Sequence, residues 1–367
     1  MPLEMPAGDD ISVLTDWVEL RVAGGIGDLP LARLNRLLKA DGSELAEQEI
    51  SADTAEEHRE PVNDDELEVH FRAENAVAAE VDVRVEQVRQ EISDREEIGS
   101  KIYPFTVDED RVRAREACGA DVYLLLLVLG SQSLPFRSER RAYEVEETYD
   151  LVALAALRRF LGRNADGVRF ARTAASASEV DGPDADPRRR PTGFADAIAW
   201  LRGWLDAGPG VRPPDDEPDT EPHWEASDED EVEAEAEHVG RRPLASYNDA
   251  GVDVVVWWRF ADERAGFPVL LAQCTVQITW EKKLDDVKLP LWQKWIDFDT
   301  VPPQKALVIP FADRRDHPNW QDRTALAGII LDRVRLVELL DELDCDELGT
   351  LVGDHARSWT LAELQAA

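Results

Sequence analysis

Two apolar runs separated by a short polar segment form the most distinctive pattern in this chain. Residues 252–260 (VDVVVWWRF) are dense in valine and tryptophan, and residues 268–280 (PVLLAQCTVQITW) are rich in aliphatic and β-branched side chains. The connection at 261–266 (ADERAG) is polar and ends in glycine. This pattern predicts a β-hairpin whose strands are buried on both faces, as in the centre of a sheet.

Apolar residues at helical spacing predict helices on both sides of the hairpin. The clearest helices cover 139–162 (ERRAYEVEETYDLVALAALRRFLG) and 193–206 (GFADAIAWLRGWLD). Residues 65–92 predict a strand (ELEVHFRAE) that continues as a helix, and residues 305–311 (KALVIPF) predict a buried strand after the hairpin. Together these segments predict an α/β (α+β) protein with a central mixed β-sheet flanked by helices.

The order of the segments predicts three parts of the chain. A smaller N-terminal α/β accessory domain spans 1–120, a second domain with the hairpin spans 121–340, and a helical tail spans 341–367. The second domain contains an insertion at about 207–240, and its proline-rich, acid-rich composition is typical of disorder or of a loosely held loop. This insertion either covers the functional site electrostatically or is a tolerated surface insertion.

The chain is strongly acidic, with 77 Asp and Glu against 41 Lys and Arg and a formal net charge of −36. Two explanations of this charge are open. One is adaptation of a whole proteome to salt or to a GC-rich genome, and the other is a function such as mimicry of nucleic acid or binding to a basic partner. Such a charge opposes nonspecific binding of polyanions at low salt. The chain starts without a signal peptide pattern, and its three cysteines lack zinc or disulfide spacing, so we expect a cytoplasmic protein with reduced thiols.

Lysine is scarce everywhere except directly after the hairpin. Only seven lysines occur in the chain, and five of them lie from Lys282 to Lys305. Trp292 and Trp295 lie in the same stretch, and Trp280 lies just before it. One interpretation is a phosphate-binding surface, for which the predicted nucleic-acid-binding residues are Lys282, Lys283, Lys288 and Lys294. The other interpretation is that these lysines are solvated positions whose stems cover the tryptophans.

The predicted hairpin carries polar groups within its apolar strands. An isolated buried carboxylate is costly, so Asp253 should be paired, hydrogen-bonded or bound to a metal. Simple antiparallel pairing places Asp253 opposite Cys274, and a shift of one residue or a bulge sets it against Gln273 or Thr275. The cysteine itself lies in an apolar strand, which favours an inert core thiol. An acid, an amide and a nearby lysine are groups that a magnesium-dependent phosphodiesterase needs.

Several short motifs resemble a known superfamily. The order of elements resembles that of the PD-(D/E)XK nucleases, which have the restriction-endonuclease-like fold. It consists of a strand that carries an acid, a hairpin, a second strand with an amide two residues before an expected cation, and a following helix. The combination of YPF at 103–105, YDLVALAALRRFLG at 149–162, GVDVVVWWRF at 251–260 and LLAQC at 270–274 is similar to bacterial proteins from phage-defence loci. The resemblance covers about residues 95–340 and implies binding of DNA, Mg²⁺ or Mn²⁺, and protein partners from a defence operon.

The resemblance also implies roles for individual residues. Asp253 is the implied first metal-binding acid, and Gln273 takes the position of the second acid, so both are expected to be catalytic and metal-binding. The first helix of such folds often carries an accessory acid, which here is Glu147 or Asp150.

The expected catalytic lysine is absent from its usual position. Thr275 stands two residues after Gln273, where the superfamily keeps that lysine. Lys282 or Lys283 would therefore have to supply the catalytic cation from the following helix. If neither lysine reaches the site, we expect the chain to keep the nuclease fold without nuclease activity and to act as a DNA-binding or scaffolding subunit.

Overall fold

The computed structural model describes thirteen stretches of the chain. They are residues 10–26, 28–40, 64–99, 101–117, 120–131, 139–171, 190–191, 193–206, 250–262, 264, 266–298, 301–313 and 318–340. The predicted insertion at 207–240 and the predicted helical tail at 341–367 lie outside them. The chain divides into two compact units, one formed by residues 1–134 with 359–367 and the other by residues 135–358.

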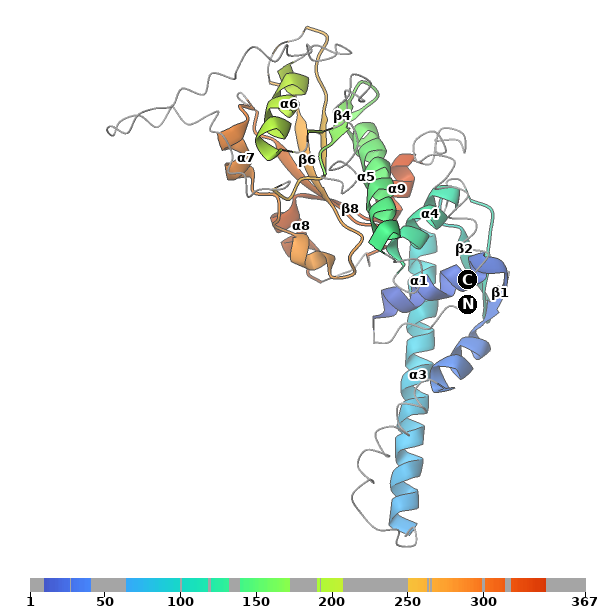
Figure 1. The fold of residues 1–367 in the computed structure, drawn as a ribbon. Helices are drawn as coiled ribbons and strands as arrows, with labels where there is room; N and C mark the ends of the chain where they lie inside the picture. Colours follow the sequence, from blue (N-terminus) through green and yellow to red (C-terminus); the bar gives the residue numbers. More distant parts are fainter. Residues whose placement is uncertain are drawn as a thin grey trace. The chain divides into compact units, whose positions relative to one another are not determined.

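The first unit contains helices and a small antiparallel sheet (Figure 1). Asp10 caps the N-terminus of its first helix, and the Asp10 side chain accepts hydrogen bonds from the backbone amides of Ser12 and Val13. In chain order its elements are α1 (Ile11–Arg21), η1 (Val22–Ile26), β1 (Asp28–Pro30), a helix at 31–40, α3 (Asp64–Ile98), β2 (Phe105–Asp108), β3 (Arg111–Ala114) and α4 (Ala120–Gly130). The strand order is β1-β3-β2, and both pairs are antiparallel.

The predicted strand at the start of 65–92 is wrong. Residues 64–98 form one helix of 35 residues, α3. The segment ELEVHFRAE alternates over only a few positions, and such a short pattern does not distinguish a strand from the first turns of a helix. The amphipathic stretch that follows, which buries Val81, Val88 and Ile92, extends the helix through both parts.

The second unit is built on a five-stranded mixed sheet with the order β4-β5-β6-β7-β8. The strands β4 (Asp166–Arg169), β5 (Val254–Trp257) and β6 (Val269–Cys274) pair antiparallel, whereas β7 (Gln304–Val308) and β8 (Ile329–Leu331) continue the sheet in parallel. The predicted α/β class with a central mixed sheet flanked by helices is confirmed. The predicted hairpin is β5 with β6, and both strands are shorter than the apolar runs that predict them.

Helices cover both faces of this sheet (Figure 1). The helix α5 (Glu139–Leu161) lies on one face, where its Leu154 side chain contacts Gly167 of β4, and α9 (Arg333–Leu340) packs against α5. The helices α6 (Phe194–Asp206) and α7 (Leu289–Trp295) pack on the opposite face. The remaining elements, η4 (Trp280–Lys283) and α8 (Trp320–Ala327), pack over β7 and β8.

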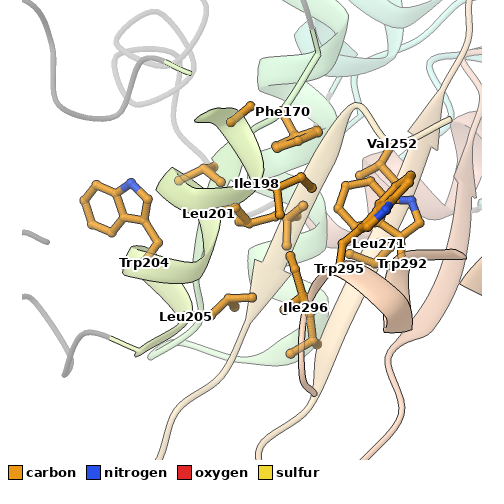
Figure 2. Close-up of a cluster of buried hydrophobic side chains, with 14 of the residues drawn as sticks. Phe170, Ile198, Leu201, Trp204, Leu205, Val252, Leu271, Trp292, Trp295 and Ile296 are labelled. Atoms are coloured by element: carbon orange, nitrogen blue, oxygen red, sulfur yellow. The ribbon is translucent and has the colours of Figure 1, made fainter. Parts of the chain in front are cut away.

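The core between the sheet and α6 and α7 is rich in aromatic side chains (Figure 2). Trp292 has no exposed surface, and its ring meets those of Phe170, Phe194 and Trp295 edge-on, with centroids 5.3, 6.3 and 5.7 Å away. The Nε1 group of Trp292 donates to the carbonyl oxygen of Ala250 at 3.3 Å. Two of the tryptophans near the lysine cluster, Trp292 and Trp295, are therefore core residues that anchor the start of the hairpin.

Candidate functional site

The hairpin places Asp253 beside Gln273. Val254 pairs with Ala272, so the preceding Asp253 falls opposite Gln273, one residue away from the simplest alignment. The backbone amide of Asp253 donates to the carbonyl oxygen of Ala272 at 2.8 Å. The Nε2 group of Gln273 donates to Oδ2 of Asp253 at 2.7 Å. The structure thus selects one of the alignments that the sequence leaves open.

Backbone groups from both neighbouring strands fix Asp253. Its Oδ2 also accepts a hydrogen bond from the amide of Cys274 at 2.7 Å. Its carbonyl oxygen accepts hydrogen bonds from the amides of Phe170 and Ala171, at 2.6 and 2.9 Å. The residue is 9% exposed. A carboxylate held in this way has one defined position before any ligand binds, which is what a metal or substrate site requires.

A glycine two residues before Asp253 allows a second segment to approach the start of the hairpin. Gly251 has φ of +76°, and a Cβ atom at this position would lie 2.5 Å from the carbonyl oxygen of Asp286. A larger residue would meet both the unfavourable backbone angle and this contact. Gly251 therefore lets the segment that follows η4 pack against the residues leading into Asp253.

A second carboxylate and a thiol lie next to Asp253. One ligand atom from each of Asp150, Asp253 and Cys274 falls within 4.8 Å of the others. Asp150 belongs to α5 and is 4% exposed, whereas Cys274 ends β6 and is 8% exposed. Within the described stretches, no other group of His, Cys, Asp or Glu has metal-binding spacing. These three residues are defined here as the acid–thiol cluster.

Arg169 on β4 connects the acid–thiol cluster to Glu147. Its Nε group donates to Oδ2 of Asp150 at 2.7 Å, and a terminal nitrogen lies 3.3 Å from Oε1 of Glu147. The Glu147 side chain is 53% exposed. Of the two accessory acids that the sequence proposes, Asp150 is the one that lies beside Asp253, whereas Glu147 contacts Arg169.

Burial dominates the acid–base behaviour of the cluster. Burial raises the pKa of Asp150 to about 7, although the charge and hydrogen bond of Arg169 lower it, and the charges of Glu146 and Glu147 raise it further. Burial also raises the pKa of the Cys274 thiol well above its ordinary value, and the charges of Asp150 and Asp253 add to this effect. A cation that binds here would displace these protons, so its binding would depend on pH.

Replacing Asp150 with asparagine should change how stability depends on pH. The pKa of Asp150 rises from 3.8 to about 7 on folding, so the stability that it contributes is present below the unfolded value and is lost as pH rises through the folded value. The difference in free energy of unfolding, Asp150→Asn minus wild type, should therefore become more positive as the pH rises from about 4 to about 8. The increase should be up to about 1.4 kcal/mol for each pH unit.

Urea unfolding of both proteins across this pH range measures the difference. The control is Asp262→Asn, because Asp262 is an exposed carboxylate on the hairpin connection that pairs with Arg264. A difference between Asp150→Asn and wild type that stays constant with pH would contradict the expectation.

Three lysines after the hairpin form ion pairs with acids close by. Lys283 lies 2.9 Å from Asp286, and both Lys288 and Lys305 contact Asp285, at 2.5 and 3.2 Å. Exposed pairs of this kind contribute little to stability and are screened by salt. They do, however, reduce the positive charge that this segment presents to a phosphate.

The two remaining lysines and Thr275 complete the predicted set. Lys282 and Lys294 have exposed side chains. Thr275 is 5% exposed, and its backbone amide donates to the carbonyl oxygen of Val308 at 3.1 Å. The position where the superfamily keeps its lysine is thus a buried position beside β7.

Sequence reasoning missed two residues of this site, Arg169 and Tyr149. Arg169 lies in the short segment DGVRF, which mixes charged and apolar residues and does not mark the arginine as the partner of a buried acid. Tyr149 directly precedes Asp150 on α5, and its ring is buried with it. No sequence pattern marks that tyrosine as different from a core residue.

Comparisons with protein-family models, with curated proteins and with solved structures find no match to this chain. Among the described helices, none has the length and apolar character that crossing a membrane requires.

Proposed function

We propose that this chain is a divalent-metal-dependent nuclease with a restriction-endonuclease-like core and DNA as its substrate. The supporting observation is the meeting of two carboxylates, Asp253 and Asp150, beside Gln273 where β5 begins and β6 ends. The mixed sheet and the strand acid agree with the arrangement that the sequence motifs resemble. Carboxylate and amide oxygens suit Mg²⁺ or Mn²⁺.

The residues present fit a bound divalent ion. Asp253 and Asp150 would hold it, and the ion would polarise a phosphodiester oxygen. Gln273 turns its amide nitrogen toward Oδ2 of Asp253 and toward the carbonyl oxygen of Cys274, which lies 3.2 Å away. The amide must therefore rotate before its oxygen replaces its nitrogen beside Asp253.

A catalytically inactive nuclease-fold subunit is the second candidate, and Thr275 favours it. A buried threonine does not stabilise developing negative charge as a lysine does, and Lys283 pairs with Asp286. Such a subunit would bind DNA or hold together a protein complex. A place in antiviral defence, with partners from the same operon, rests on the sequence resemblance alone and stays a prediction.

Cleavage of DNA by the purified protein tests the first candidate. Plasmid, linear and single-stranded DNA are incubated with Mg²⁺ or Mn²⁺ at several salt concentrations, because the affinity of the acidic chain for DNA should depend on salt. We expect nicking or cutting that Asp253→Asn reduces about 100-fold or more, since it removes the charge of a metal ligand. The control Asp262→Asn, a change of the same kind on the same hairpin, should cleave like the wild type.

The outcomes separate the two candidates. DNA that stays intact in every condition but shifts in a binding assay supports the inactive subunit. Cleavage that survives Asp253→Asn would overturn the assignment of the site. Neither binding nor cleavage would overturn both candidates as far as they involve DNA.

A further inference from the structure

We propose that the acid–thiol cluster binds a thiophilic transition metal, with Sγ of Cys274 as a ligand beside the carboxylates of Asp150 and Asp253. The inference rests on the proposed function, because it names the ion that the same site would use. It also departs from that function's oxygen-only ligand set, since it makes a cysteine part of the site.

The three ligand atoms come from separate elements and meet at one point. Asp150 projects from α5, Asp253 precedes β5, and Cys274 ends β6. Their ligand atoms lie within 4.8 Å of one another. Two ligands of a tetrahedral zinc ion, bound at about 2.0 to 2.3 Å each, are about 3.3 to 3.8 Å apart. The three ligand atoms would therefore move toward one another by up to about 1.5 Å to close around one ion.

Both carboxylates are already oriented by other groups. Arg169 holds Asp150 at 2.7 Å, and the amide of Cys274 holds Asp253 at 2.7 Å. Partners that hold ligands in place in this way raise metal affinity, because less freedom is lost on binding. The backbone amide of Cys274 thus orients one proposed ligand, Asp253, and the thiol of Cys274 is itself another.

A buried hydroxyl gives an independent indication of a ligand. Tyr149 is 1% exposed, and its Oη atom has no hydrogen-bond partner within the described residues. The groups that interact electrostatically with this hydroxyl are Cys274 and Asp150 of the cluster, together with Asp332 and Arg333. Buried polar atoms are normally hydrogen-bonded. A solvent or substrate oxygen on the bound ion would be a suitable partner.

The thiol decides which cations fit. Mg²⁺ and Ca²⁺ take oxygen ligands, whereas Zn²⁺ and Co²⁺ also take thiolate ligands. One sulfur with two oxygens therefore favours Zn²⁺ or Co²⁺ over Mg²⁺. Three protein ligands also leave a fourth position for solvent or substrate, which is the arrangement of catalytic zinc sites.

Absorption spectroscopy with Co²⁺ tests the thiol ligand directly, without any activity assay. Titration of the wild-type chain with Co²⁺ should produce the near-ultraviolet charge-transfer absorption of a cobalt–thiolate bond, saturating near one ion per chain. Zn²⁺ should abolish the absorption at equal concentration, and about a 100-fold excess of Mg²⁺ should leave it.

The variants identify the sulfur and the oxygens. Cys274→Ser should lose the charge-transfer absorption, and Asp253→Asn should weaken Co²⁺ binding about 10-fold or more. Cys274→Ala is the second variant for the buried position if serine unfolds the protein, as circular dichroism will show. The matched control replaces the two other cysteines, Cys118→Ser with Cys345→Ser, and should keep the absorption.

The results distinguish this inference from the proposed function. Absence of the absorption in the wild type, or its persistence in Cys274→Ser and Cys274→Ala, overturns the thiol ligand. DNA cleavage with Mg²⁺ and no such absorption leaves the nuclease and removes the transition-metal site. A Cys274-dependent absorption without cleavage by any metal supports the metal site and rejects the nuclease.

Discussion

Replacing Arg95 with methionine should destabilise the first unit by about 3 to 5 kcal/mol near pH 7, the cost of leaving buried charges uncompensated. Arg95 lies on α3 and is 2% exposed. Its guanidinium contacts Asp16 and Glu19 at 2.8 Å and Glu91 at 3.1 Å. The variant keeps three acids in this buried place and removes the cation that pairs with all of them.

The loss should become smaller as pH falls. In the wild type, burial alone would lower the pKa of Arg95, but the charges of Glu19 and Asp16 raise it well above its ordinary value. Without the arginine, the buried acids hold protons more tightly in the folded than in the unfolded state. Their contribution is then present at low pH and is lost as pH rises, so the variant recovers toward about pH 4.

Urea unfolding at several pH values gives the size of the effect, and hydrogen exchange assigns it to the first unit. Arg89→Met is the matched control, because Arg89 lies on the same helix, is exposed and pairs with Glu86 at 3.6 Å. The control should change stability by less than about 0.5 kcal/mol. A loss below about 1 kcal/mol for Arg95→Met, or one that does not vary with pH, would contradict the expected role of the pairs.

Additional hydrogen bonds explain why one acid of this network matters most. Glu19 has no exposed surface and accepts hydrogen bonds from the hydroxyl groups of Tyr103, at 2.6 Å, and Tyr123, at 2.9 Å. The double variant Arg95→Met with Glu19→Gln removes one charge of each sign. It should therefore recover part of the stability that Arg95→Met loses, because fewer unpaired charges remain buried.

Local patterns predict the parts of the fold that local physics determines. The helix α5 follows from helical spacing of its apolar residues, and the hairpin of β5 and β6 follows from two apolar runs around a polar turn. Local pattern does not predict the strand β4, because DGVR has four residues and two of them are charged. It becomes a strand through pairing with β5, which lies far away in the sequence.

In the candidate site, too, local sequence predicts some contacts, and packing between distant segments determines the others. Hairpin pairing brings Asp253 and Gln273 together, so the sequence predicts that they are neighbours. Packing of α5 on the sheet brings Asp150 to Cys274, and no sequence pattern contains that contact. The interpretation of Cys274 as an inert core thiol agrees with its burial, but it does not foresee the two carboxylates beside it.

Replacing Trp292 with alanine should destabilise the second unit by about 3 to 5 kcal/mol, the usual cost of truncating a large buried aromatic side chain. Trp292 of α7 is fully buried in the core cluster that joins α6, α7 and the sheet (Figure 2). Its ring meets those of Phe170, Phe194 and Trp295. Trp292→Phe keeps most of the aromatic volume, and it removes part of the ring together with the hydrogen bond to the Ala250 carbonyl. It should therefore cost about 1 to 2 kcal/mol. Urea unfolding measures both, with Lys294→Ala on the exposed face of the same helix as the control.

Trp292→Ala should also weaken metal binding by the acid–thiol cluster, because it disturbs the backbone around Asp253. Trp292 donates a hydrogen bond to the carbonyl oxygen of Ala250, three residues before Asp253. Phe170, whose ring meets that of Trp292 edge-on, donates its backbone amide to the carbonyl oxygen of Asp253. A cavity in place of the indole releases both supports. Co²⁺ affinity should then fall in Trp292→Ala under conditions where the protein is still folded, and fall less in Trp292→Phe. Equal affinity in all three proteins would mean that the hydrogen bonds to Cys274 and Gln273 alone hold the carboxylate in position.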